Sequence, residues 1–420
     1  MARRLRFAMV TTFYPPYHRG GDAIQVYRLS EALAARGHQV AVVHSQDAYR
    51  LRPGSETPGP AFDRHPNVTI HGLETTWGLA SALAAHQLGR PGLYSRRLRR
   101  LLGNGDFDVV HFHNVSLLGG PGVFGFGGGV KLYTAHEYWL VCPTHVLFAF
   151  DREACTERRC LRCTVVHYHR PPQAWRATGA LRRGLAHVDA LVMESRFARE
   201  AHRAQGIDRP MVVLPPIVPE LPDDGREEPD LPGRPFFLYV GRLERLKGVD
   251  DLLSAFASYR EADLVVVGTG SLEARWRERA RGWPHVRFLG RRHPASLGRL
   301  YRRAIAVVVP SLCYETFGLT LAESLACGTP VLARRIGALA EVLEETGGGL
   351  AFDTVEELRA AMETLRTDAP RRRSLGERGR QAARRLWSGD AHLHAYLDLV
   401  DGLQRDPGRA ASAAGSQTWT

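Results

Sequence analysis

Residues 305–327 carry the feature that most constrains the fold of this chain, an apolar run followed by a loop and a helix. The run IAVVV, residues 305–309, ends at a Pro-Ser pair and is typical of a buried parallel strand. The loop contains Glu315, and the helix expected from Gly318 carries Glu323 in its early turns. The first N–H groups of a helix bind anions such as phosphate, and carboxylates accept hydrogen bonds from hydroxyl groups. The pattern therefore indicates a nucleotide-sugar site, and the alternative is an ordinary strand–helix unit with two surface glutamates.

Two basic residues follow a second apolar run at residues 236–240. The segment GRLERLKG places Arg242 and Lys247 at the carboxyl end of this expected strand, where open parallel sheets bind ligands. The chain has 56 lysines and arginines, and only Lys131 and Lys247 are lysines. A lysine kept in so arginine-rich a chain indicates that a compact, flexible charge is needed, as on a diphosphate. A solvated helix start would explain the two residues equally well.

Taken together, these motifs resemble a known enzyme family. VGRLERLKG, VVVGTGSL, VRFLGR and VPSLCYETFGLTLAESLACGTPVLA, in this order, are similar to the donor half of the family-4 retaining glycosyltransferases, or glycosyl transferases group 1. RGGDAIQVYRLSEALAARGHQVAVV is similar to the N-terminal signature of that family, so the resemblance covers nearly the whole chain. It implies an α/β chain of the GT-B fold, with two doubly wound Rossmann-like domains facing a central cleft. It also implies a nucleotide-sugar donor, of the UDP or GDP type, and a hydroxyl acceptor in a glycan, glycolipid or secondary metabolite.

The resemblance also implies roles for residues of the second half. The groups expected to take up charge on the diphosphate are Arg242, Lys247, Gly318, Leu319 and Thr320. Glu315 would hold hydroxyls of the donor sugar and Glu323 the ribose, while the backbone near Gly290 and Arg291 would help to select the base and sugar. For retention, the family implies front-side attack by the acceptor hydroxyl, with the leaving phosphate taking its proton. Neither glutamate is then a nucleophile.

Three features of the first half are candidates for the same site. Gly20-Gly21 follows the first expected strand, where its backbone can approach an oxyanion; the resemblance places it at the donor diphosphate or the acceptor, and a simple tight turn is the alternative. The segment DVVHFHN puts His111 and His113 on one face of a strand end. Strand-end histidines are more often structural, and the resemblance assigns only His113 a hydrogen bond to the donor sugar. His136-Glu137-Tyr138 is expected to border the acceptor cleft.

Alternating strands and helices predict two doubly wound domains, and 420 residues fit two domains of about 200 residues each. The expected strands are 5–11, 40–44, 68–73, 109–113, 130–134, 190–193, 236–240, 264–268, 286–289 and 305–309. The expected helices are 23–36, 249–259, 272–281 and 297–303, besides the one that starts at Gly318.

The domain boundaries follow from changes in composition. We expect an acceptor-binding domain over 1–214, a Pro-rich acidic linker over 215–235 and a donor domain over 236–387. An apolar stripe that includes Leu393, Tyr396 and Val400 predicts a helix over 388–404 that returns to the first domain. The small-residue tail over 405–420 has a composition typical of disorder.

No catalytic metal is expected. Metal-dependent sugar transferases hold a divalent ion with a D-x-D triplet, and the triplet here, Asp106-Phe107-Asp108, precedes a buried strand at its far end from the expected site. The basic pair Arg242 and Lys247 makes a metal on the diphosphate unnecessary.

A structural metal is expected in a polar insertion at about residues 140–165. Its four cysteines have the spacing C-x12-C-x4-C-x2-C and are Cys142, Cys155, Cys160 and Cys163. In a cytosolic chain such closely spaced cysteines favour metal over disulfides, and tetrahedral zinc would hold together a segment too polar for a core of its own. The alternatives are an iron–sulfur cluster and four unligated thiols. The remaining two, Cys313 and Cys327, are expected to be small buried residues.

The net charge of +12 has two interpretations. The stretches SRRLRRLL and AWRATGALRRGL set arginines beside apolar residues, which suits the surface of an anionic membrane that carries a lipid-linked acceptor. Solvated helix faces are the more ordinary explanation. Because the sequence has no apolar run of 18 residues and its start lacks the apolar region of a signal peptide, we expect a cytoplasmic protein, with peripheral contact at the inner face of the membrane left open.

Two other functions fit parts of the sequence. A nucleic-acid-binding protein would use the basic surface and the four cysteines, but it would need neither the glutamate pair nor Arg242 and Lys247, so no nucleic acid is expected as a partner. A GT-B phosphorylase or a sugar-binding pseudoenzyme would keep the fold and the sugar site. Phosphate-dependent release of a sugar phosphate would identify the phosphorylase.

Overall fold

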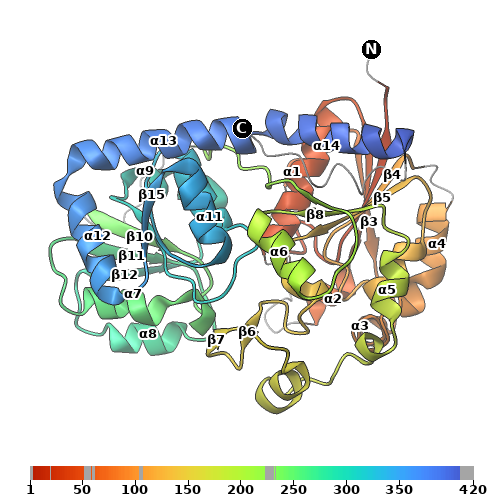
Figure 1. The fold of residues 1–420 in the computed structure, drawn as a ribbon, viewed down its shortest axis with the longest axis horizontal. Helices are drawn as coiled ribbons and strands as arrows, with labels where there is room; N and C mark the ends of the chain where they lie inside the picture. The colour runs from red at the N-terminus through yellow and green to blue at the C-terminus, as the bar shows by residue number, and fades with distance from the viewer. Residues whose placement is uncertain are drawn as a thin grey trace. The chain divides into compact units, whose positions relative to one another are not determined.

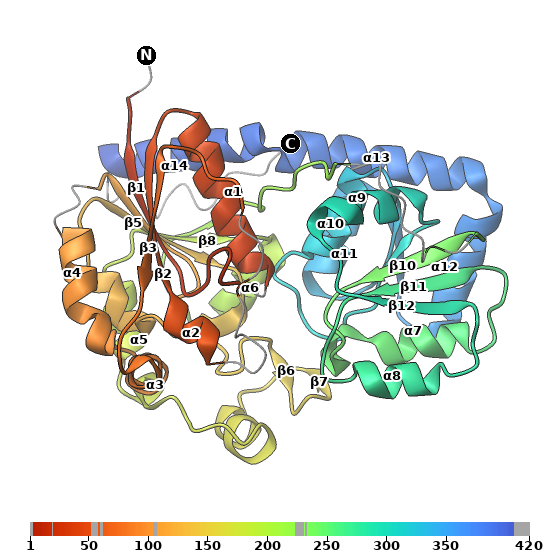
Figure 2. The ribbon, with the colours of Figure 1, turned by 180° about the vertical axis from the view of Figure 1, so that it is seen from behind.

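The structure is a computed structural model that describes residues 3–18, 20–51, 58, 62–103, 107–222, 231 and 233–406. Its internal contacts divide the chain into two units. Unit 1 comprises Met1–His145, Arg159–Ile217 and Gly389–Thr420, and unit 2 comprises Val146–Arg158 and Val218–Ser388. Figures 1 and 2 show the ribbon of each unit from opposite sides.

Unit 1 is built on a seven-stranded sheet in which every neighbouring pair is parallel. The strand order is β3-β2-β1-β4-β5-β8-β9. The strands are β1 (Arg6–Val10), β2 (Gln39–Ser45), β3 (Val68–Leu73), β4 (Val109–Phe112), β5 (Val130–Ala135), β8 (Ala190–Met193) and β9 (Met211–Val213).

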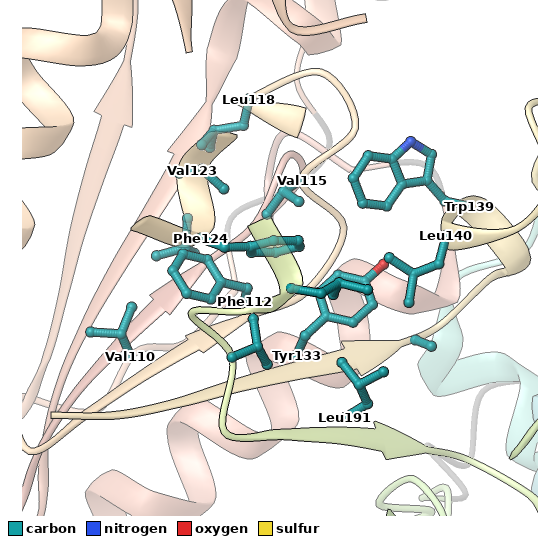
Figure 3. Packing of buried hydrophobic residues seen from close by; sticks show 14 of the residues in the cluster. Val110, Phe112, Val115, Leu118, Val123, Phe124, Tyr133, Trp139, Leu140 and Leu191 are labelled. Carbon is teal, nitrogen blue, oxygen red and sulfur yellow. The ribbon is translucent and has the colours of Figure 1, made fainter. Parts of the chain in front are cut away.

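Apolar clusters cover both faces of this sheet, which explains why most residues of its strands are apolar. On one face, Phe7 and Met9 of β1 pack with α1 (Gly21–Ala35) and α14 (Gly389–Arg405). On the other face, Phe112 and Tyr133 pack with Phe124, as Figure 3 shows. The remaining helices of unit 1 are α2 (Gln46–Arg50), α3 (Gly78–Leu88), α4 (Ser95–Gly103), α5 (Ala180–Leu185), α6 (Arg196–Ala204) and the short turns η1 (Gly92–Tyr94), η2 (Gly120–Gly125), η3 (Tyr138–Leu140), η4 (Arg162–His167) and η5 (Ala174–Ala177).

Unit 2 repeats the plan with a six-stranded parallel sheet of order β12-β11-β10-β13-β14-β15. The strands are β10 (Phe236–Val240), β11 (Asp263–Val267), β12 (Val286–Gly290), β13 (Val307–Val309), β14 (Val331–Arg334) and β15 (Gly349–Phe352). The helices are α7 (Val249–Phe256), α8 (Glu273–Arg279), α9 (Pro294–Arg303), α10 (Leu319–Ala326), α11 (Gly337–Thr346), α12 (Val355–Thr367), α13 (Ala369–Trp387) and the turn η6 (Arg245–Lys247).

The strand order reverses at one place in each sheet. In unit 1 the sheet grows outward in both directions from β1 and β4, and in unit 2 from β10 and β13. Ligands of doubly wound sheets bind beyond the carboxyl ends of the strands at this reversal. The α/β fold class is therefore confirmed for each unit, and the expected sites follow these strands.

The ten expected strands are all present, with bounds that differ by no more than two residues from those observed. The structure adds β9, β14 and β15 and several helices that the periodicity did not single out. The acidic part of the linker at 223–230, the tail beyond residue 406 and Asp106 lie outside the described residues. The helix expected over 388–404 is α14, so Arg405 is helical rather than part of the tail.

The cysteine-bearing insertion divides between the units, whereas the sequence interpretation placed all of it in the first domain. Val146–Arg158 belongs to unit 2 and forms a small hairpin of β6 (Phe148–Ala149) and β7 (Glu153–Ala154). The reason is apolar packing within unit 2, because Phe148 is buried against Leu246 and Cys313.

The last helix completes the core of unit 1. Leu393, Tyr396 and Val400 are buried in the cluster formed with β1 and α1. The Tyr396 hydroxyl lies 3.0 Å from His111 Nδ1, and His392 Nδ1 lies 2.7 Å from the carbonyl oxygen of Pro215. None of the helices in the described ranges has the length and apolar content needed to cross a bilayer.

We predict that Leu393→Ala lowers the free energy of unfolding of unit 1 by about 2–5 kcal/mol, because it leaves a cavity in a packed core. The control is His394→Ala at the next position, where the side chain is 79% exposed and a change of about 0.5 kcal/mol or less is expected. Calorimetry of both variants measures the shift in Tm. Equal Tm values for the two would show that α14 contributes little to the core.

Candidate functional site

The loop after β10 holds the first basic residue of unit 2. Its backbone is fixed because Gly241 N–H donates to the Val267 carbonyl at 3.0 Å and the Tyr239 hydroxyl donates to the Arg242 carbonyl at 2.8 Å. The Arg242 guanidinium is about half exposed and donates to Glu244 at 2.9 Å. The loop therefore presents a cation at the strand reversal.

Lys247 and Glu315 form an ion pair beyond the ends of β10 and β13. Lys247 Nζ donates to Glu315 Oε1 at 2.6 Å, and Ser311 Oγ donates to the same oxygen at 2.8 Å. Burial alone would lower the pKa of Lys247, but the Glu315 carboxylate outweighs it and raises that pKa. Burial would likewise raise the pKa of Glu315, but Lys247 holds it below its usual value. Both groups are therefore charged at neutral pH, with side chains only 18% and 21% exposed.

A glycine is required where the two loops meet. Gly248 has φ +70°, and a Cβ at this position would lie 1.9 Å from the Pro310 carbonyl oxygen. Leu312 N–H donates to the Leu246 carbonyl at 2.8 Å, which joins the same two loops. This close backbone approach brings Lys247 within reach of Glu315.

The start of α10 is open to an anion. Gly318 caps the helix with φ +100° and no side-chain hydrogen bond to the first amides. Within the helix, Thr320 Oγ1 donates to the Val240 carbonyl at 3.3 Å, which places this end of α10 beside β10. The amide groups at Gly318, Leu319 and Thr320 are therefore suited to phosphate oxygens.

Glu323 lies on α10 and is fixed by a buried tyrosine. The Tyr301 hydroxyl donates to Glu323 Oε2 at 3.3 Å. Burial, and then the charge of Glu323, raise the pKa of Tyr301 well above its usual value, so the phenol keeps its proton. At the end of β12, Gly290 has φ +67° and accepts a hydrogen bond from Gly268 N–H at 2.8 Å, while Arg291 is exposed.

In unit 1, His111 is held by two neighbours. Its Nδ1 lies 3.0 Å from the Tyr396 hydroxyl and its Nε2 lies 2.7 Å from Thr134 Oγ1. Burial lowers the pKa of His111 well below its usual value, so the ring is neutral. With both nitrogens engaged, His111 has a structural place in the core.

His113 lies in a chain of three polar side chains. His113 Nδ1 is 3.0 Å from His136 Nε2, and His136 Nδ1 is 2.8 Å from Glu194 Oε1. All three residues are almost wholly buried. The structure thus brings together two histidines that the sequence singled out separately and adds a carboxylate that it did not.

The other first-half candidates are Gly20, Gly21, Glu137 and Tyr138, and none of them shares the His113–His136–Glu194 hydrogen bonds. Gly20 caps α1 without a side-chain hydrogen bond, and Gly20 and Gly21 are exposed, so the helix start can accept an anion. Glu137 pairs with His145 at 2.7 Å. Tyr138 is buried and stacks on His202 with 5.4 Å between ring centroids.

The cysteines differ in burial. Cys142 and Cys163 are buried, and Cys155 and Cys160 are partly buried. Burial lowers the pKa of the nearby Arg176 to about 10, against the opposing effect of Cys142 and Cys160. In the part of the chain that the structure describes, no three His, Cys, Asp or Glu side chains are grouped to hold a metal ion. The zinc site therefore stays a prediction from cysteine spacing.

Cys313, Cys327 and Asp108 contribute to packing and to contacts between strands. Burial raises the pKa of Cys313 to about 12, which leaves a neutral thiol, while Cys327 is only partly buried rather than fully buried as expected. Asp108 accepts a hydrogen bond from Arg6 N–H at 2.8 Å and pairs with Arg3 at 2.7 Å, which ties the starts of β1 and β4 together.

Sequence reasoning missed three polar partners of the candidate residues. Ser311 contacts Glu315, Tyr301 contacts Glu323, and Glu194 contacts His136. Of these, Glu194 had a detectable signal, because it directly follows the expected strand 190–193. Ser311 and Tyr301 had none, since serine after a strand and tyrosine on a helix are common.

Comparisons with known proteins find matches to glycosyltransferases over nearly the whole chain. Residues 20–216 match the family described as glycosyl transferase 4-like domain, and residues 223–382 match glycosyl transferases group 1. A D-inositol 3-phosphate glycosyltransferase of Xylanimonas cellulosilytica is 30% identical over 93% of this chain and 94% of its own. A glycogen synthase of Mycobacterium tuberculosis is 28% identical over 94% of this chain and 95% of its own.

Solved structures give the same result for the fold. A sucrose-phosphate synthase of Thermosynechococcus elongatus has a TM-score of 0.74 at 20% identity and covers 96% of this chain and 100% of its own. The Anabaena protein HepE in complex with UDP-glucose has a TM-score of 0.67 at 15% identity, with coverages of 95% and 100%. At such low identity these likenesses establish the fold alone.

Proposed function

Because the chain belongs to the glycosyl transferases group 1, and so is a glycosyltransferase of the GT-B fold, we propose that it transfers a sugar from a nucleoside diphosphate to a hydroxyl acceptor with retention. The Lys247–Glu315 ion pair, next to the open start of α10, is the observation that carries this proposal. A fixed cation suits the leaving diphosphate, and a fixed carboxylate suits the sugar hydroxyls.

The proposed mechanism depends on stabilising charge as the bond to the diphosphate breaks. Arg242, Lys247 and the first amides of α10 would take up the negative charge on the phosphate oxygens. The acceptor hydroxyl would attack from the side that the diphosphate leaves, and its proton would pass to the departing phosphate oxygen. The new bond forms at the anomeric carbon as the old one breaks, so no charge remains unbalanced. Glu315 and His113 would hold the donor sugar, and Glu323 the ribose.

The donor is proposed to be a UDP- or GDP-sugar. Support comes from HepE, whose solved structures hold UDP and UDP-glucose, and from a second protein of this fold with bound UDP-2-fluoro glucose. The acceptor is proposed to be a hydroxyl of a glycan, glycolipid or secondary metabolite. The named relatives act on different acceptors, so their names support only the class of acceptor group.

We predict that Lys247→Ala and Arg242→Ala each lower transfer activity about 10²-fold or more, because each removes a positive charge from the leaving group. Arg281→Ala, whose guanidinium is 78% exposed in the same unit, is the control and should keep its activity. In a thermal-shift panel of UDP-, GDP-, TDP- and ADP-sugars, a ligand at about 100 times its Kd should stabilise the wild type by about 2.7 kcal/mol. Absence of a shift with every nucleotide sugar would contradict the proposed function.

We also infer peripheral contact with an anionic membrane from the cytoplasmic side. Five large apolar side chains between residues 77 and 93 are exposed, namely Trp77, Leu79, Leu83, Leu88 and Leu93. They belong to or adjoin α3 and η1, which lead directly into α4 in unit 1 (Figure 2). The exposed arginines of α4 are Arg96, Arg97, Arg99 and Arg100, and residues 75–105 contain no Asp or Glu. Apolar side chains beside arginines, in a segment without acidic residues, suit insertion among anionic headgroups.

We predict that the protein co-sediments with vesicles of phosphatidylglycerol and phosphatidylcholine but not with phosphatidylcholine alone. Leu79→Ser with Leu83→Ser, and separately Arg96→Gln with Arg97→Gln, should weaken this binding. The control with the same net charge is Arg371→Gln with Arg373→Gln, on exposed positions of α13. Equal binding to both vesicle types, or equal loss in the control, would rule out this surface.

We propose one structural zinc ion per chain on Cys142, Cys155, Cys160 and Cys163, supported by their spacing in a polar insertion. Protein purified without chelator should contain about one zinc by elemental analysis. Cys160→Ser or chelation should lower the Tm, because metal binding contributes to folding. Cys327→Ser is the matched control outside the insertion. Protein without stoichiometric zinc would reject the proposal.

A further inference from the structure

Three neighbouring strands of unit 1 end in residues that are hydrogen-bonded to one another. His113 directly follows β4, His136 directly follows β5, and Glu194 directly follows β8; these three strands are adjacent in the sheet. The two contacts measure 3.0 and 2.8 Å, and the planes of the two rings differ by only 17°. Because the three side chains are hydrogen-bonded in series, the protonation state of one residue determines which nitrogen of the next carries a proton.

The contacts allow two arrangements, because a neutral histidine carries its proton on one nitrogen only. In both, His136 Nδ1–H donates to the Glu194 carboxylate. If His136 also carries a proton on Nε2, it donates to His113 Nδ1, and the proton of His113 must be on Nε2. If His136 is neutral, His113 Nδ1–H donates to His136, and His113 Nε2 can only accept.

The surroundings favour the first arrangement. Burial opposes a charge on His136, but Glu194, followed by Asp22 and Glu137, outweighs burial and raises the pKa of His136. Burial, with His111 and His136, lowers the pKa of His113 well below its usual value. The titratable groups around the chain are Asp22 on α1, His111 on β4, Glu137 after β5, Glu194 after β8, and His392 and Tyr396 on α14.

His113 Nε2 is the end of the chain. It is buried and, among the residues that the structure describes, has no hydrogen-bond partner. His113, His136 and Glu194 line a small cavity of about 20 Å³ together with Gln25 and Tyr396. A buried N–H group at this position needs an acceptor, such as an oxygen atom, for its hydrogen bond.

We propose that Glu194 is a positioning residue that, through a doubly protonated His136, fixes His113 as the tautomer with its proton on Nε2. His113 then donates a hydrogen bond to an oxygen of the substrate. That this oxygen belongs to the donor sugar rests on the proposed function, whereas the tautomer does not. Loss of the proton from His136 converts His113 Nε2 from a donor into an acceptor, so transfer activity should fall as the pH rises through the pKa of His136.

The tautomer is tested without any substrate, by ¹⁵N NMR of the histidine rings in the full-length protein, with His113→Asn used for assignment. In the wild type at neutral pH we expect protons on both nitrogens of His136 and on Nε2 of His113. In Glu194→Gln, which keeps the acceptor oxygen but not the charge, His136 should be neutral and the His113 proton should move to Nδ1. Glu194→Asp should keep the wild-type pattern. A proton on His113 Nδ1 in the wild type, or the same pattern in Glu194→Gln, would overturn the proposal.

Kinetics test the consequence for transfer. At neutral pH, Glu194→Gln should lower kcat/KM about 10²-fold, the effect of losing one donor, and should regain activity at lower pH. Glu194→Asp should keep the wild-type pH profile, as should Glu200→Gln, an exposed carboxylate on α6. A wild-type protein that shows the expected tautomer but transfers no sugar would contradict the proposed function alone. Active protein with an unchanged pH profile in Glu194→Gln would contradict the positioning role alone.

Discussion

Burial of the parallel strands on both faces governs where polar chemistry can occur in each unit. Because β1, β4, β10 and β13 are buried and mostly apolar, the charged groups of the candidate sites lie at or beyond the ends of these strands. Parallel strands deliver those loops to one edge, so residues far apart in the sequence meet there. Lys247 and Glu315 are 68 positions apart and share a hydrogen bond, and His136 and Glu194 are 58 apart and do the same. The carboxyl edge of each sheet therefore collects the polar groups.

The two clusters handle charge in different ways. In unit 2, Lys247 and Glu315 each keep the other charged, so a positive and a negative group are held in fixed positions. In unit 1, the proposed positive charge of a doubly protonated His136 faces the carboxylate of Glu194, which raises the pKa of His136 together with Asp22 and Glu137. A fixed ion pair suits the constant charge of a diphosphate. A movable proton suits a hydroxyl group, which can both donate and accept.

Local patterns of the sequence predict the strands and the residues that follow them, because an apolar run and its end are properties of neighbouring residues. This is why Arg242, Glu315, His113 and His136 could be identified as candidates. The pairing of these residues could not be predicted. The contact of Lys247 with Glu315 depends on the close approach of the Gly248 backbone to Pro310, where an added Cβ would lie 1.9 Å from the carbonyl oxygen, and only the fold reveals this approach. The hairpin at Val146–Arg158 belongs to unit 2 for a similar reason, since Phe148 packs against Leu246 and Cys313, which are 98 and 165 positions away. Glu194 was overlooked although it obeys the strand-end rule.

The path of the chain between the units limits how such a protein can be rearranged in evolution. The backbone passes from one unit to the other after His145, Arg158, Ile217 and Ser388. Because α14 supplies Leu393 and Tyr396 to the core of unit 1, exchanging everything after residue 217 for the corresponding half of a relative would also replace part of the first core. A successful recombination must therefore either keep α14 with its original partners or bring in a helix that fits the same sheet. The part of the chain after residue 217 is thus not an independent module, because its last helix belongs to the core of unit 1.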